Sequence, residues 1–118
     1  MQQNYDLHGI RVEIVRLASS ARTRRTDFTA AYPTTWHPTG IADPRSMSAF
    51  TEAGAWEWVI EHVSSGVTLY PMILDKPPGR KAYYFEAPAA FPPSMIYVKL
   101  QICGDHIRGR SFHLSNRG

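Results

Sequence analysis

The sequence predicts an α+β domain in which helices pack on a small, largely antiparallel sheet. A helical pattern occupies residues 43–65, whereas strand patterns separated by turn signals fill most of residues 67–115. A chain of 118 residues is long enough for one hydrophobic core and too short for two, so we expect residues 1–118 to form a single domain. Its 43% hydrophobic and 19% charged residues are typical of a globular protein.

The N-terminal third is expected to contain one strand and one long loop. Residues 9–16 alternate isoleucine and valine with arginine and glutamate, a period of two that predicts a half-buried strand. The basic stretch that follows has no clear period and is expected to be a short helix or a loop. Residues 28–42 contain two prolines and a glycine and predict a loop, whose Tyr32, Trp36 and His37 either stack on a ligand or fold back over the core.

A helix is predicted to begin at Asp43 and Pro44, because aspartate caps free helix amides and proline at the first helical position loses no hydrogen bond. We expect it to end before Gly66. Its apolar residues do not share one face of a continuous helix, so we expect a break near Gly54. The apolar stripe of the second segment comprises Trp56, Val59, Ile60 and Val63.

The strands of the sheet are predicted to follow this helix. Residues 67–74 predict a strand, which Pro71 assigns to a sheet edge or a bulge. Residues 82–87 predict a short aromatic strand, bounded by a proline-glycine turn and a proline-rich loop. Residues 95–115 predict a hairpin of two strands.

The composition excludes several classes of protein. The net charge of +3 permits a nucleic-acid partner without requiring one. A single cysteine, Cys103, excludes an internal disulfide and multi-cysteine zinc sites, and favours a cytoplasmic location. We expect no membrane span, because no apolar stretch is long enough. We expect no leader peptide, because the first residues lack the pattern of a signal or transit peptide. The five histidines have no ligand spacing, so neither a metal nor another cofactor is expected.

Cationic residues gather near the end of the chain without compensating acids. Asp105 is the one acid between Lys99 and Arg117, a stretch that also contains Arg108 and Arg110. An edge hairpin can use charge simply to stay soluble. The imbalance nevertheless indicates an anionic ligand for this hairpin.

Two registers of the hairpin are possible, and they assign different residues to each face. With a two-residue turn at Gly104 and Asp105, Lys99 lies opposite Arg110, and His113 falls on the face away from the polar side chains. Like charges directly opposite each other are destabilising, unless an anion lies between them.

With a three-residue loop and a bulge, Tyr97 faces His113, Lys99 faces Ser111, and Phe112 turns toward the core. The two arginines of the second strand then have to snorkel or reach the rim of the sheet. A one-residue slip turns every side chain over, so the two registers are expected to exclude each other. We favour the second, because it gathers the polar groups on one face.

The segments "IYVKLQI" and "GRSFH", separated by a polar turn, resemble the C-terminal hairpin of the MqsR-type messenger-RNA interferases, toxins with a RelE-like fold. The resemblance covers roughly the last fifth of the chain. It implies that Tyr97 corresponds to the family's active-site tyrosine, and that His113 replaces its terminal catalytic lysine. It also implies RNA as substrate and an antitoxin or immunity protein as partner. The candidates for the family's upstream site residues are Arg80, Lys81 and Tyr84.

These residue types suit metal-independent RNA cleavage, which needs a base, an acid and cations around the phosphate. The expected catalytic residues are His113 as proton carrier, Tyr97 to orient the phosphate or stack on a base, and Lys99 for charge. The expected RNA-binding residues are Arg80, Lys81, Tyr84, Arg108, Arg110 and Ser111. The alternative is a non-catalytic RNA-binding or protein-interaction module, since tyrosine is an ordinary strand residue and lysine a common anti-aggregation device. The sequence leaves the oligomeric state open.

Overall fold

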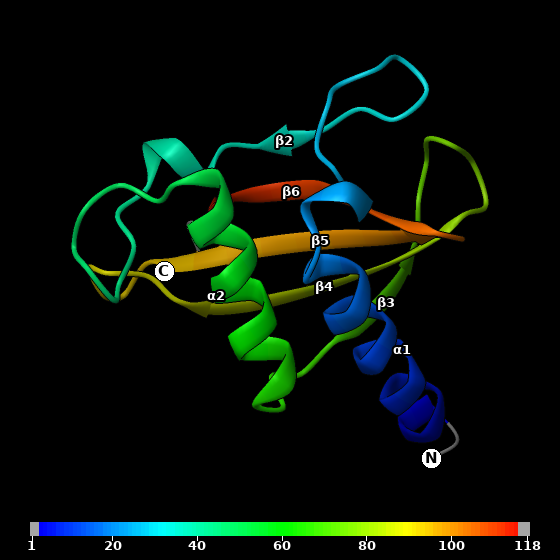
Figure 1. Cartoon of the computed structure of the whole chain (residues 1–118), viewed down its shortest axis with the longest axis horizontal. Coiled ribbons are helices and arrows are strands. Elements are labelled where there is room, and N and C mark those ends of the chain that lie inside the picture. Colours follow the sequence, from blue (N-terminus) through cyan, green and yellow to red (C-terminus); the bar gives the residue numbers. More distant parts are fainter. Residues whose placement is uncertain (1–2, 116–118) are drawn as a thin grey trace.

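Two helices cover one face of a mixed six-stranded sheet, so the predicted α+β class is confirmed (Figure 1). The computed structural model describes residues 3–115, with side chains from residue 7 onward. The helices are α1 (Gln3–Ala18) and α2 (Glu52–Ser64), and the short 3-10 turns are η1 (Ala21–Thr23) and η2 (Pro38–Gly40). The strands are β1 (Arg24–Arg25), β2 (Thr35–Trp36), β3 (Tyr70–Ile73), β4 (Lys81–Pro88), β5 (Met95–Cys103) and β6 (His106–Ser115). The sheet order is β1-β6-β5-β4-β3, and β2 also pairs with β6.

Strands β3 to β6 form the antiparallel meander that the turn signals predicted. β3 is an edge strand, as Pro71 indicated, because proline has no amide hydrogen to donate to a further neighbour. The sequence did not predict β1 and β2, which run parallel to β6. The segment predicted to be a loop is therefore attached to the sheet at Thr35 and Trp36.

The prediction of a strand over residues 9–16 is wrong, because these residues belong to α1. Ile14 and Leu17 are at most 1% exposed, and Ile10 packs against the core, whereas Val12 is 54% exposed. The buried residues follow the three- to four-residue spacing of a helix face. The alternation of apolar and charged residues matched the period of a strand, over a stretch too short to distinguish a strand from a helix.

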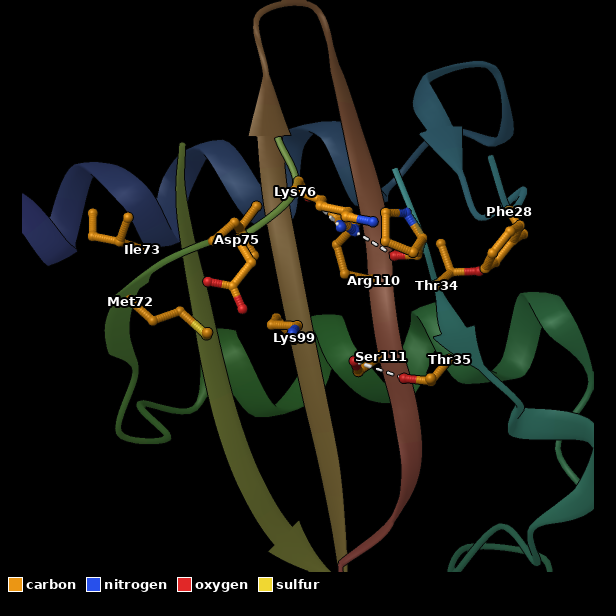
Figure 2. Close-up of a pocket in the computed structure, with 12 residues that line it drawn as sticks. Phe28, Thr34, Thr35, Met72, Ile73, Asp75, Lys76, Lys99, Arg110 and Ser111 are labelled. Carbon is orange, nitrogen blue, oxygen red and sulfur yellow. Dashed lines mark hydrogen bonds between the residues drawn. The ribbon is translucent and has the colours of Figure 1, made fainter. Parts of the chain in front are cut away.

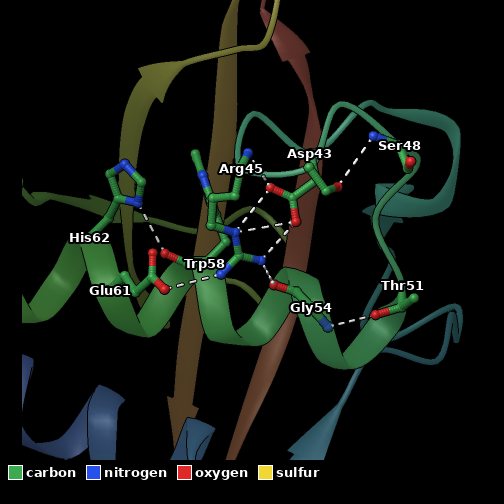
Figure 3. A network of polar contacts seen from close by, with 9 residues as sticks. Asp43, Arg45, Ser48, Thr51, Gly54, Trp58, Glu61 and His62 are labelled. Carbon is green, nitrogen blue, oxygen red and sulfur yellow. Dashed lines mark hydrogen bonds and ion pairs between the residues drawn. The ribbon is translucent and has the colours of Figure 1, made fainter.

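α2 begins at Glu52 rather than at Asp43, so the predicted helix start is wrong and the break expected near Gly54 lies at the true N-terminus (Figure 3). The Thr51 hydroxyl caps the helix by accepting a hydrogen bond from the Gly54 amide at 2.8 Å. Asp43 instead accepts hydrogen bonds from the amide and the guanidinium of Arg45, at 2.9 and 2.7 Å. These bonds hold the pKa of the Asp43 carboxyl below its usual value. The predicted apolar stripe is confirmed: Trp56, Val59 and Val63 are buried and Ile60 is partly buried.

The core lies between the helices and the inner face of the sheet, which carries Phe85 and Phe112. Trp36 of β2 joins this core, since its indole stacks on Trp56 with ring centroids 4.9 Å apart. It also lies against Gly109, where a Cβ atom would come within 2.5 Å of the Trp36 ring. Of the two alternatives for Trp36, covering the core is the one that the structure shows.

The hairpin of β5 and β6 contains both of the registers that were expected to exclude each other. A two-residue turn, with Gly104 at φ +68°, sets the pairing near the tip, so the expected three-residue loop is wrong. A β-bulge then leaves Arg110 without a partner on β5 and shifts the register by one residue. Beyond the bulge Tyr97 lies opposite His113, as predicted, and Phe112 faces the core.

Candidate active site

The outer face of the sheet, defined as the face turned away from the helices, carries all three residues predicted for catalysis. Lys99 lies opposite Ser111 and next to Tyr84, and Tyr97 lies opposite His113. Directly opposite side chains in an antiparallel pair share a face and are close enough to interact. The structure therefore brings these five predicted residues together.

Four aromatic rings cross the outer face as a row made of Tyr70, Tyr84, Tyr97 and His113. Successive ring centroids are 5.2, 5.5 and 5.3 Å apart, and successive ring planes are inclined by 26°, 34° and 30°. The first pair is stacked and the other two are tilted, and all three distances are those of interacting aromatic pairs, so each ring is held by its neighbours. Burial raises the pKa of Tyr97, and the charges of Tyr84 and Glu86 act in the same direction. Tyr97 therefore keeps its phenolic proton at neutral pH and can donate it.

The His113 imidazole is held in one tautomer by its backbone. Its Nδ1 lies 3.0 Å from the carbonyl oxygen of Leu114. A carbonyl oxygen only accepts, so Nδ1 carries the hydrogen of the neutral ring. The other ring nitrogen, Nε2, then has its lone pair free to accept a proton.

A cleft of about 460 Å³ opens on the outer face beside this row (Figure 2). Its floor consists of Lys99, Arg110 and Ser111, and its two walls are residues 33–35 with Phe28 on one side and residues 72–76 on the other. The Thr35 hydroxyl donates a hydrogen bond of 2.9 Å to the Ser111 hydroxyl across the floor. A volume of this size is within the range of about 300–1,000 Å³ that is typical of ligand sites.

Lys99 presents a half-buried ammonium to the cleft. Burial lowers its pKa, and the positive charge of Arg110 adds to this effect, while the carboxylate of Asp75 opposes it. Among the residues that the structure describes, no oxygen accepts a hydrogen bond from this ammonium. An ammonium that has lost part of its water without gaining a partner attracts an anion.

Arg110 is a buried structural residue, which corrects the expectation that it reaches the rim of the sheet. It is 4% exposed and donates to the Pro33 carbonyl at 2.9 Å and the Lys76 carbonyl at 2.7 Å (Figure 2). It also donates to the Gln101 side-chain oxygen at 2.7 Å. These bonds join both walls of the cleft to the sheet. Its three acceptors are neutral, so its positive charge still acts on the cleft.

Arg108 does not reach the rim either, because Tyr32 covers it. The centre of its guanidinium lies 4.0 Å from the centroid of the Tyr32 ring. Its ion pair with Asp27 is long, at 3.8 Å. The Nε and Nη1 atoms of Arg108 are buried and have no hydrogen-bond partner.

The upstream candidates Arg80 and Lys81 lie away from the Tyr97–His113 pair. Arg80 is exposed in the turn between β3 and β4, and its charge acts on Cys103 near the hairpin tip. Lys81 is exposed at the start of β4, and strand alternation directs it to the face opposite that of Tyr84.

Sequence reasoning missed Glu86, which lies opposite Tyr97 on the outer face. Its carboxylate accepts a hydrogen bond of 2.7 Å from the Ser115 hydroxyl. The hairpin itself is poor in acids, but β4 brings a carboxylate to the same face. The sequence did contain a signal for Glu86. It is two residues after Tyr84 in a predicted strand, and residues two apart on a strand share a face.

No three histidine, cysteine, aspartate or glutamate side chains gather to hold a metal ion within the part of the chain that the structure describes. Neither α1 nor α2, over residues 3–115, has the length and apolar character that a membrane span requires. Comparison of the chain with protein-family models, with curated proteins and with solved structures gives no match.

Proposed function

We propose that the protein is an endoribonuclease that cleaves single-stranded RNA without a metal ion, on the outer face of its sheet. The observation that carries the proposal is the contact between the rings of Tyr97 and His113 beside the unpaired ammonium of Lys99. A proton acceptor (His113), a proton donor (Tyr97) and a cation (Lys99) thus lie on one face of the sheet, in neighbouring cross-strand pairs. Metal-independent RNA cleavage uses these three kinds of group.

Each residue has a distinct role in the proposed reaction. The Nε2 atom of His113 takes the proton of a ribose 2′-hydroxyl, whose oxygen attacks the adjacent phosphorus. Lys99 stabilises the negative charge that grows on the phosphate oxygens. The departing 5′-oxygen takes the phenolic proton of Tyr97, and the imidazolium then returns its Nε2 proton to the phenolate through water. The products are a 2′,3′-cyclic phosphate and a free 5′-hydroxyl, and DNA is not a substrate because it lacks the 2′-hydroxyl.

The proposal includes the biological role that the resemblance implies. An endoribonuclease of this kind harms the cell that makes it, so we propose a toxin that a protein partner, an antitoxin or an immunity protein, keeps inactive. The outer face is the surface that such a partner has to cover. Co-expression with the product of a neighbouring small gene is expected to restore growth to cells that express the protein.

RNA cleavage is expected to continue in excess EDTA, because the proposed groups are all side chains. Purified protein is incubated with a labelled single-stranded RNA, with EDTA or with Mg²⁺, and the products are separated by electrophoresis. Equal rates in the two conditions support the proposal. Cleavage that stops in EDTA and returns with Mg²⁺ contradicts it.

RNA binding is expected to weaken steeply with salt, since cations on the outer face contact phosphates. Each contact with a single strand contributes about −0.7 to the slope of log affinity against log salt. We expect Lys99→Ala to reduce the slope by about that amount and the exposed Lys81→Ala, on the opposite face, to leave it unchanged. A deoxyribonucleotide analogue serves as ligand, so cleavage does not interfere. Equal slopes for the two variants contradict a role for Lys99 in binding.

The second candidate function is an RNA-binding module without catalysis. The concentration of charge around Lys99, Arg108 and Arg110 favours it, because this charge attracts a phosphate strand whether or not His113 reacts. Salt-dependent binding of RNA that remains intact over long incubation would identify this function. An affinity that does not depend on salt would leave a protein-interaction module.

A further inference from the structure

The guanidinium of Arg108 is buried without adequate compensation. Its side chain is 17% exposed, and its Nε and Nη1 atoms have no hydrogen-bond partner. The side-chain oxygen of the neighbouring Gln101 accepts a hydrogen bond from Arg110 and none from these two atoms. Arginine stays charged in proteins, so the burial leaves a cation that has lost water and gained little in return.

The residues around Arg108 increase the positive charge. Arg25 of β1 is its partner in the parallel ladder, and the charge of Arg108 lowers the pKa of the adjacent Arg110 in addition to the effect of burial. Burial raises the pKa of the nearby Cys103 thiol, while the charge of Arg108 and a weak hydrogen bond between its guanidinium and the sulfur oppose that rise. Asp27 is the one carboxylate within 4.0 Å of Arg108 among the side chains that the structure describes, at 3.8 Å.

The segment that covers Arg108 is lightly held. Tyr32 lies over the guanidinium through a cation–π contact, and Asp27 is 64% exposed on its side chain. Residues 27–31 are exposed throughout, and backbone hydrogen bonds between Thr29 and Tyr32 close this segment on itself. Separation of the segment from the sheet therefore costs the contact of Tyr32 with Arg108, its longer contact with Arg110 at 5.9 Å, and one long ion pair.

We propose that Arg108 is a latent binding site for a phosphate group, closed in this structure by Tyr32 and Asp27. The Asp27 carboxylate occupies the position of an anion but lies too far away to hydrogen-bond. A phosphate that displaced it would supply oxygen acceptors to the two orphaned nitrogen atoms. The site lies beside Arg110, which forms part of the cleft floor, so it is placed to receive a phosphate of a strand that extends beyond the cleft.

A buried guanidinium with two unsatisfied nitrogen atoms also predicts an unusual effect on stability. Replacing a buried charge by an apolar side chain of similar size is often neutral or stabilising. Arg108→Met is therefore expected to keep or raise the midpoint of thermal unfolding while it removes the phosphate site. A guanidinium retained only for packing would give the opposite result, a lower midpoint.

The test measures binding of inorganic phosphate, and of a short deoxyribonucleotide that the proposed reaction cannot cleave, to the full chain by NMR titration. Asp27→Asn removes the competing carboxylate and is expected to tighten phosphate binding by on the order of fivefold. Asp105→Asn removes the same charge from an exposed carboxylate at the hairpin tip, paired with His106, and is expected to change the affinity much less. Arg108→Met is expected to weaken binding at least about tenfold.

Each outcome bears on the latent site separately from catalysis, because no cleavage is measured. The site is supported if Asp27→Asn binds phosphate more tightly, Asp105→Asn does not, and Arg108→Met loses phosphate binding. If the oligonucleotide follows the same pattern the phosphate belongs to a strand, and if inorganic phosphate alone follows it the ligand is a free phosphate. Equal effects of Asp27→Asn and Asp105→Asn, unchanged phosphate binding in Arg108→Met, or a lowered unfolding midpoint in that variant overturns the proposal.

Discussion

Replacing His113 by alanine is expected to slow RNA cleavage by about 10²–10⁴-fold, the usual contribution of a positioned proton carrier. The variant keeps Tyr97 and Lys99, so its affinity for a deoxyribonucleotide analogue is expected to change little. The measurement is the initial rate of cleavage of a labelled RNA at saturating protein. The pattern of a large loss in rate with little loss in binding is specific to a catalytic group.

A matched control comes from another histidine of the same chain. His37 is exposed, precedes the η2 turn and lies outside the cleft lining, so His37→Ala is expected to leave the rate unchanged. Circular dichroism checks that both variants keep the fold. A rate for His113→Ala within about threefold of that of His37→Ala would be far below the expected contribution and would contradict the catalytic role.

Replacing Arg110 by methionine is expected to destabilise the fold by about 3 kcal/mol, the second large effect that the structure predicts. The substitution removes three hydrogen bonds from a charged donor and leaves the carbonyls of Pro33 and Lys76 without it. Bonds to a charged group contribute about 1.5–3 kcal/mol each, and the cost of burying the charge offsets part of the sum. Urea titration measures the change.

Arg16→Met provides the control for this stability prediction. Arg16 pairs with Glu13 on the surface of α1, with a side chain that is 60% exposed, and exposed pairs contribute about 0–1 kcal/mol. We therefore expect a clear separation between the two methionine variants. Equal unfolding midpoints would mean that Arg110 does not join the cleft walls to the sheet in the way described. Because Arg110→Met affects the whole cleft, it is unsuited to measuring a single phosphate contact.

The sequence predicted β3 to β6 and the second half of the helix well, because strong turn signals separate long periodic segments there. It failed for residues 9–16, because apolar residues at every second position fit a strand. In the structure Val12 is exposed and Ile14 is buried, which is the pattern of a helix, but the sequence alone does not show which of the two is buried. It failed again at Asp43, since a capping residue also forms turns, and the nearby Arg45 favoured the turn.

The candidate site was predicted in part: the pairing of Tyr97 with His113 was predicted, and the bulge at Arg110 was not. Both registers occur in the structure, but the expectation that they exclude each other is wrong, because a bulge at Arg110 combines them and that bulge depends on distant partners. Trp36 lies against Gly109, and Pro33 and Lys76 accept from Arg110. The burial of Arg108 and Arg110 likewise results from loops that fold over the sheet. Hydrophobic periodicity carries no information on such long-range polar contacts.

The connections of β6 also determine when the candidate site can assemble as the chain is synthesised. β6 pairs with β1, β2 and β5, all of which precede it along the chain. The Thr35–Ser111 hydrogen bond joins residues 76 positions apart, and contacts of such separation form late in folding. On the ribosome, the segment with Trp36 has no strand to join until β6 has emerged. The cleft, the row of aromatic rings and the Arg110 hydrogen bonds therefore form together, once β6 is available for pairing.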